Sequence, residues 1–85
     1  MEKQERDDGK YTTTDFYTTA VLVLKKFEVL EIRAQGPNGK VKRFIFEDTQ
    51  ELRDTILSYM NGSMEGNLRE FRNAIETVKD MVHSG

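Results

Sequence analysis

The chain has 85 residues, of which 36% are hydrophobic and 33% are charged, with a net charge of −2. This length and composition indicate one globular domain. The absence of cysteine excludes a disulfide framework and thiolate chemistry, and the longest apolar run, residues 20–24, is far too short to span a bilayer. Since residues 1–10 also lack the apolar segment of a signal peptide, we expect a cytoplasmic protein with no membrane partner.

The first ten residues are mostly charged, and Met1 is their only apolar residue. Such a segment cannot bury enough apolar surface to offset the entropy lost on ordering its backbone. We therefore expect residues 1–10 to be a disordered tail and residues 11–85 to form the single domain.

A first helix is expected over residues 15–26, capped by Thr13 or Thr14 and with Asp15 in its first turn, where a negative charge suits the helix dipole. Its apolar residues follow helical spacing: Phe16, Ala20, Val23, Leu24 and Phe27. Several β-branched residues lower its helix propensity, but a strand would have to be unusually long.

Residues 27–48 contain two runs that alternate between apolar and polar side chains, as half-buried strands do. Leu30, Ile32 and Ala34 share one face of the first run, and Phe44 and Phe46 share one face of the second. The link Gly36-Pro37-Asn38-Gly39 has turn residues throughout, which favours a type I turn closed by a glycine bulge. This segment is predicted to be an antiparallel hairpin.

Two helices are predicted after the hairpin. The first begins with Asp48 as its cap and ends near Met60, where Asn61-Gly62 gives a left-handed stop. The second begins at the cap Asn67 and carries the clearest apolar stripe in the chain: Leu68, Phe71, Ile75, Val78 and Val82. We expect the centre of the core to be made by Phe44, Phe46, Phe71 and Ile75.

The expected fold is α+β, a small two-layer domain in the order helix, β-hairpin, helix, helix, with a two-stranded antiparallel sheet. Two strands leave edges that three helices cannot easily cover. Antiparallel pairing of the second strands of two copies would extend the sheet to four strands in a homodimer, with Val41 and Ile45 at the interface. The alternative is a monomer in which the first helix packs on that face.

Several short motifs occur together in a characteristic order: Thr14-Asp15-x-Tyr17, Phe44-Ile45-Phe46-Glu47-Asp48, Tyr59-x-Asn61-Gly62, and Phe71-x-Asn73-Ala74 with Lys79. In this, the chain resembles, over about residues 11–82, a family of small prokaryotic and phage-encoded domains that is catalogued only as a domain of unknown function. The resemblance implies a mobile-element or chromosomal origin and a small accessory role, and it supplies no catalytic residue. The family usually has a glycine between the first helix and the first strand, where this chain has Lys26-Phe27-Glu28.

No motif for catalysis or cofactor binding is found, so we expect no cofactor, no metal and no enzymatic activity. His83, the only histidine, lies near the end of the chain, where residues fray. Four carboxylates cluster near the start of the second helix: Glu47, Asp48, Glu51 and Asp54. They could hold a hard cation such as magnesium, but a capping role beside the positive helix terminus explains them more simply.

Two functional hypotheses remain. Residues 25–43 carry six basic side chains against two acidic ones, so the hairpin could bind nucleic acid through Arg33, Lys40, Lys42 and Arg43. The acidic total charge argues against strong binding to phosphates. We therefore favour an interaction or regulatory module whose partner is a protein, including a second copy of itself, with Met60, Met64 and Met81 as residues that could line an adaptable groove.

Overall fold

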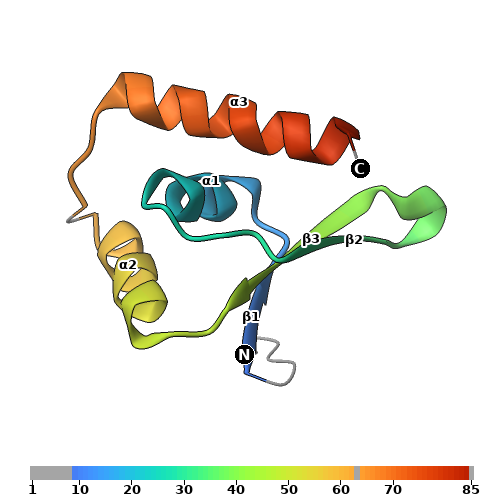
Figure 1. Cartoon of the computed structure of the whole chain (residues 1–85), viewed down its shortest axis with the longest axis horizontal. Helices are drawn as coiled ribbons and strands as arrows, with labels where there is room; N and C mark the ends of the chain where they lie inside the picture. Colours follow the sequence, from blue (N-terminus) through green and yellow to red (C-terminus); the bar gives the residue numbers. More distant parts are fainter. Residues whose placement is uncertain (1–8, 63, 85) are drawn as a thin grey trace.

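The structure is a computed structural model, and it describes residues 9–62 and 64–84. It has an α+β fold with three helices and a three-stranded antiparallel sheet (Figure 1). In chain order the elements are β1 (Lys10–Thr13), α1 (Phe16–Leu24), β2 (Glu31–Gln35), a short 3₁₀ turn (Pro37–Gly39), β3 (Val41–Glu47), α2 (Gln50–Met60) and α3 (Leu68–Ser84). The fold class is as expected from the sequence, but the two-stranded sheet and the order that began with a helix are wrong.

The additional strand, β1, pairs antiparallel with β3, placing Tyr11 opposite Phe46 and Thr12 opposite Ile45. The backbone N–H of Asp48 also donates to the carbonyl of Gly9 at 3.1 Å. The predicted tail therefore does not extend to residue 10, and residues 1–8 lie outside the described part of the chain. Burial, the largest cause, raises the pKa of the Tyr11 hydroxyl, and the nearby Asp15 carboxylate raises it further, against a lowering by the hydrogen bond with Thr13.

The strand order is β1-β3-β2, so β3 is the central strand and is hydrogen-bonded along both edges. This corrects the prediction that two copies pair along the whole of their second strands, since β1 occupies one edge of β3 over residues 44–47 and β2 occupies the other over residues 41–45. Ile45 is only 4% exposed and cannot serve as an open interface residue, whereas Val41, at the distal end of β3, is 44% exposed.

The turn between β2 and β3 differs from the expected type I turn. The N–H of Gly39 donates to the carbonyl of Gly36 at 3.0 Å, and Asn38 and Gly39 both have positive φ, 63° and 62°. A type I turn needs negative φ at the position of Asn38, which instead uses the left-handed region that asparagine tolerates. A Cβ at position 39 would lie 3.2 Å from the Cβ of Ala34, so this position also leaves little room for a side chain.

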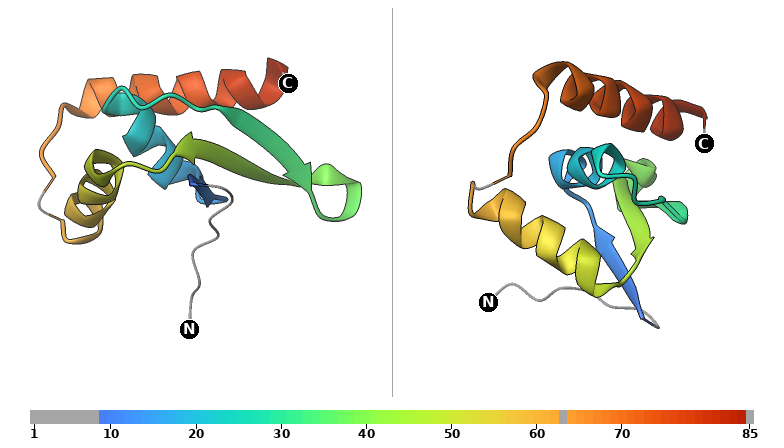
Figure 2. Two further views of the ribbon diagram at one scale, coloured as in Figure 1. Left: turned by 60° about the horizontal axis from the view of Figure 1, so that its bottom comes forward. Right: turned by 60° about the vertical axis from the view of Figure 1, so that its left-hand side comes forward.

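The core lies between one face of the sheet and the helices, and α1 lies between α3 and the strands (Figures 1 and 2). Phe44 and Phe46 are buried at its centre, as predicted. From α3, however, Ala74 and Val78 are buried, while the predicted Phe71 and Ile75 are only partly buried. The most buried side of α3 therefore passes through Ala74 and Val78, and not through Phe71 and Ile75 as predicted.

The helix caps confirm one predicted residue and correct two. Asp15 caps α1, because its carboxylate accepts the N–H of Tyr17 at 3.3 Å and the hydroxyl of Thr18 at 2.5 Å. Thr49, and not Asp48, caps α2 by accepting the N–H of Leu52 at 3.1 Å. Asn67 caps α3 as predicted, accepting the N–H groups of Arg69 and Glu70.

The end of α1 has the hydrogen bonds of a Schellman motif. The N–H of Phe27 donates to the carbonyl of Leu22 at 2.9 Å, and the N–H of Lys26 donates to that of Val23 at 3.0 Å. Lys26 has a φ of 76°, in the left-handed region where glycine is normally found. The resemblance to the family led us to expect a glycine in this segment, and a glycine would adopt this conformation without strain.

We expect Lys26→Gly to raise the free energy of unfolding by about 1 kcal/mol, because glycine has no Cβ to oppose a left-handed backbone. Lys25 is the matched control: its φ of −88° suits any residue, so Lys25→Gly should give no gain. Urea denaturation of the two variants and the parent measures the difference. Equal or opposite shifts would mean that position 26 is not strained.

Candidate functional site

The four predicted nucleic-acid contacts lie on opposite faces of the sheet. Arg33 and Arg43 are cross-strand partners on the face turned away from Phe44 and Phe46. Arg33 pairs with Glu31 at 3.1 Å, and Arg43 donates to Gln35 at 3.0 Å and to Thr12 at 3.2 Å. These two arginines are therefore part of a hydrogen-bonded polar surface.

Lys40 and Lys42 instead line a groove between the tip of the hairpin and the C-terminal part of α3. This basic groove has a volume of about 460 Å³. Its lining residues are Thr14, Phe16, Lys40, Val41, Lys42, Phe44, Lys79, Val82 and His83. Among the residues that the structure describes, the lining holds three lysines and a histidine but no carboxylate. The Lys42 ammonium donates to the carbonyl of Gly39 at 3.2 Å, so the turn fixes its position.

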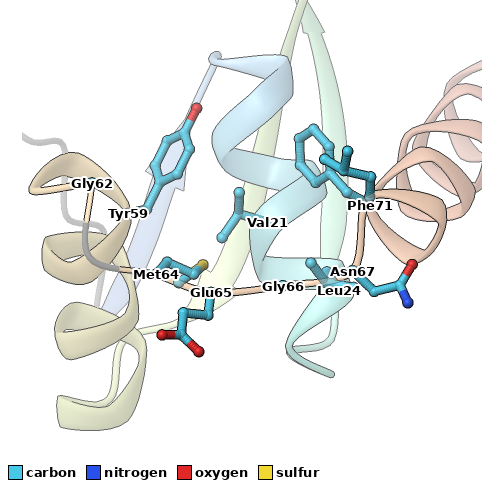
Figure 3. Close-up of a pocket in the computed structure, with 10 residues that line it drawn as sticks. Val21, Leu24, Tyr59, Gly62, Met64, Glu65, Gly66, Asn67 and Phe71 are labelled. Atoms are coloured by element: carbon cyan, nitrogen blue, oxygen red, sulfur yellow. The ribbon is translucent and has the colours of Figure 1, made fainter.

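A second groove lies where α1, α2 and α3 meet, and we call it the apolar groove. Its volume is about 330 Å³. It is lined by Val21 and Leu24 of α1, Tyr59 of α2, residues 62 and 64–67 of the connecting loop, and Leu68 and Phe71 of α3. Figure 3 shows Tyr59 and Met64 on one side of this space, with Val21, Leu24 and Phe71 across from them.

The loop from α2 to α3 shapes the apolar groove. Gly62 has a φ of 72°, and its N–H donates to the carbonyl of Tyr59 at 3.2 Å, which ends α2 and turns the chain. The Lys25 ammonium donates to the carbonyl of Glu65 at 3.5 Å, which ties the loop to the end of α1. Met64 is thereby held partly buried against the groove. Leu68, in the first turn of α3, is 85% exposed at its rim.

The predicted carboxylate cluster is engaged in other contacts. Asp48 accepts from the Nε of Arg53 at 3.0 Å, Asp54 accepts from the side-chain amide of Gln50 at 2.9 Å, and Glu47 lies 3.8 Å from the Lys10 ammonium. Within residues 9–62 and 64–84, no group of three or more histidine, cysteine or acidic side chains could hold a metal ion. In the same part of the chain, every helix is too short or too polar to cross a membrane.

Sequence reasoning identified only part of each groove. Met64 was predicted as a groove residue, and the structure places it there, whereas Met60 and Met81 lie outside the lining. Phe71 was assigned to the core, but it forms one wall of the apolar groove, and Tyr59 of α2 forms another. Lys79 and His83 approach Lys40 only because α3 runs back over the hairpin, and no local sequence pattern reports that contact.

Comparison with known proteins identifies a family for this chain. No curated protein and no solved structure matches the chain significantly. A family model, DUF5659, described as a domain of unknown function, matches residues 8–84 and therefore nearly the whole chain. This confirms the resemblance to a family of unknown function, and the match covers β1 as well as the elements expected from the sequence. The chain belongs to the DUF5659 family.

Proposed function

We propose that the protein is a non-enzymatic interaction module that binds apolar side chains of a partner protein in the apolar groove. The observation that supports this most directly is the lining: apolar side chains from three helices and the connecting loop surround one open space of about 330 Å³. Binding sites for small groups are concave and mostly apolar, with volumes that start near 300 Å³.

The side chains around the groove suit binding of a protein segment. Leu68 is 85% exposed, so its apolar surface is largely free to be buried by a partner. Met64 has a flexible thioether side chain that can adapt to differently shaped anchors. The aromatic rings of Tyr59 and Phe71 offer large, rigid contact surfaces of the kind that dominate interface energetics.

The size of the groove indicates what kind of segment would bind. About 330 Å³ accommodates one or two large apolar side chains and not a folded domain. An amphipathic helix presents such anchors at spacings of three and four residues, which is a recurrent way of filling a groove between helices. We therefore propose an amphipathic segment with leucine or aromatic anchors as the ligand.

Photo-crosslinking from position 68 tests this proposal. A diazirine analogue of leucine at position 68 should crosslink a discrete partner in cells that produce the chain, and Met64→Asp should reduce the yield at least tenfold. The reason is that an anchor entering the groove would desolvate the new carboxylate. The matched control is the same analogue at position 57, because Leu57 is 58% exposed but does not line the groove.

The outcome that contradicts the proposal is a crosslink of equal yield from positions 57 and 68, or one that is insensitive to Met64→Asp. The circular dichroism spectrum of Met64→Asp must match that of the parent for this comparison to hold. Since Met64 lies in the loop and is only partly buried, this substitution is expected to leave the fold intact.

The basic groove supports a second candidate, the binding of single-stranded nucleic acid. The favouring observation is that Lys40, Lys42 and Lys79 line the groove beside Phe16, with no carboxylate among the described lining residues. Lysines can neutralise phosphates, and an aromatic ring can stack on a base. Affinity for single-stranded DNA that falls steeply with salt and is weakened by Lys40→Ala would support this candidate, and undetectable binding at low salt would remove it.

A further inference from the structure

β2 is an edge strand whose side chains are mostly exposed. Of its five residues only Ile32 is partly buried, and the other four are exposed. Within residues 9–62 and 64–84, β3 is the only strand that pairs with β2. The opposite edge of β2 therefore presents backbone N–H and C=O groups that another strand can bind.

The sequence of this edge is complementary to itself in the antiparallel direction. Glu31 and Arg33 lie on the polar face, and Ile32 and Ala34 lie on the face that carries Phe44. Leu30 directly precedes the strand and is 43% exposed. On each side of Ile32 there is first a charged residue and then an apolar one. Glu31 and Leu30 precede Ile32, and Arg33 and Ala34 follow it, so the two charges have opposite signs.

We propose that two copies of this chain associate through β2, antiparallel about a two-fold axis that passes by Ile32. In this register Glu31 lies opposite Arg33 of the second copy, and the same pair forms again on the other side of the axis. The apolar face brings Ile32 next to its own copy and Leu30 next to Ala34 of the second copy. The result is a continuous six-stranded sheet.

The positions of the charged side chains favour this register over the two registers in which the axis passes by Glu31 or Arg33. A shift that centres the axis on Arg33 places two arginines opposite each other, and the reverse shift does the same with two copies of Glu31. Like charges that are directly opposite destabilise a strand pair, whereas opposite charges stabilise it. Within one chain the Nε of Arg33 lies 3.1 Å from the Oε2 of Glu31. Pairing of two copies would bring two such ion pairs together, so that each carboxylate lies beside two guanidinium groups.

Charged side chains on an edge strand usually prevent it from pairing with another strand. A charge prevents pairing when the partner brings the same sign or nothing to meet it. Here the two-fold axis places Arg33 of the second copy opposite Glu31, so each charge meets one of opposite sign. The contact is short, five residues from each copy, so the area buried is small and association in the micromolar range is expected. The edge of β2 is separate from the apolar groove, which lies among the helices.

Sedimentation equilibrium of the full chain at tens of micromolar tests the proposal. The parent should be a dimer, and Arg33→Glu should weaken association at least tenfold, because it brings four carboxylates together. The double variant Glu31→Arg/Arg33→Glu should restore the dimer, because it exchanges the charges without changing their complementarity. Arg72→Glu, which makes the same charge change on the exposed surface of α3, is the matched control and should remain a dimer.

Arg33→Glu should fold normally, since it replaces an arginine that faces Arg43 with a residue of opposite charge. A monomeric parent, a dimer insensitive to Arg33→Glu, or a double variant that stays monomeric would each overturn the proposal. The register can be measured separately with a spin label on a single introduced cysteine, because the chain has no cysteine of its own. Spin labels on Gln35→Cys should lie about 20 Å apart in the dimer, six residues along the strands at roughly 3.4 Å each.

Discussion

A chain that begins at Thr14, and so lacks β1, is expected to remain unfolded at room temperature. Without β1 the sheet is reduced to a two-stranded hairpin, which is marginal in water on its own. The deletion also removes Tyr11, which is buried in the core with its ring centroid 6.5 Å from that of Phe46. Far-ultraviolet circular dichroism and urea denaturation measure the effect.

A chain that begins at Gly9 is the control for this deletion. It keeps every hydrogen-bonded pair between β1 and β3, as well as the bond from Asp48 to Gly9. Its thermal midpoint should lie within a few degrees of that of the parent. If the chain that begins at Thr14 melted cooperatively near the same temperature, β1 would contribute little to the fold.

Phe46→Ala is expected to lower the free energy of unfolding by about 3–5 kcal/mol. Phe46 is fully buried at 0% exposure on the central strand, where it packs in the core with Tyr11 and Leu52 among others. The cavity left by the ring cannot easily collapse, because Phe46 lies on the central strand and is paired with Tyr11 of β1. A loss of this size is a large share of the stability of a small domain.

Phe71→Ala provides the comparison for this prediction. Phe71 is only partly buried beside the apolar groove, so its removal should cost clearly less than that of Phe46. Urea denaturation with a common slope gives both values. Equal losses for the two variants would show that Phe71, and not the pair Ala74 and Val78, marks the buried line of α3.

The parts of the fold that could be predicted are those with long, regular patterns. Alternation over the hairpin and the stripe of apolar residues in α3 each span several periods, so chance matches are few. β1 has four residues, and Tyr11 pairs with Phe46, far along the chain. The residues of Tyr11-Thr12-Thr13 favour strands, but so short a run carries no periodicity, and only its distant partner makes it a strand.

The candidate site was less predictable than the fold, for a related reason. Each groove is built from residues of separate elements, and their meeting depends on how α3 crosses α1 and the hairpin. The separation of Lys42 from Arg43 did follow from the sequence, since neighbouring residues of a strand point to opposite faces. The prediction that Arg33, Lys40, Lys42 and Arg43 form one binding surface did not take this alternation into account.

α3 follows β1, β2 and β3 in the chain, and this order affects the protein while it is being made. The strands that the structure describes lie within residues 10–47, whereas α3, which packs on α1, ends at Ser84. Synthesis at about 5–20 residues per second leaves roughly 2–7 s between completion of β3 and completion of α3. During that interval the sheet can form, but the side of α1 that α3 will cover stays open to water. The nascent domain therefore exposes apolar residues of α1, such as Val23 and Leu24, more fully until α3 is complete.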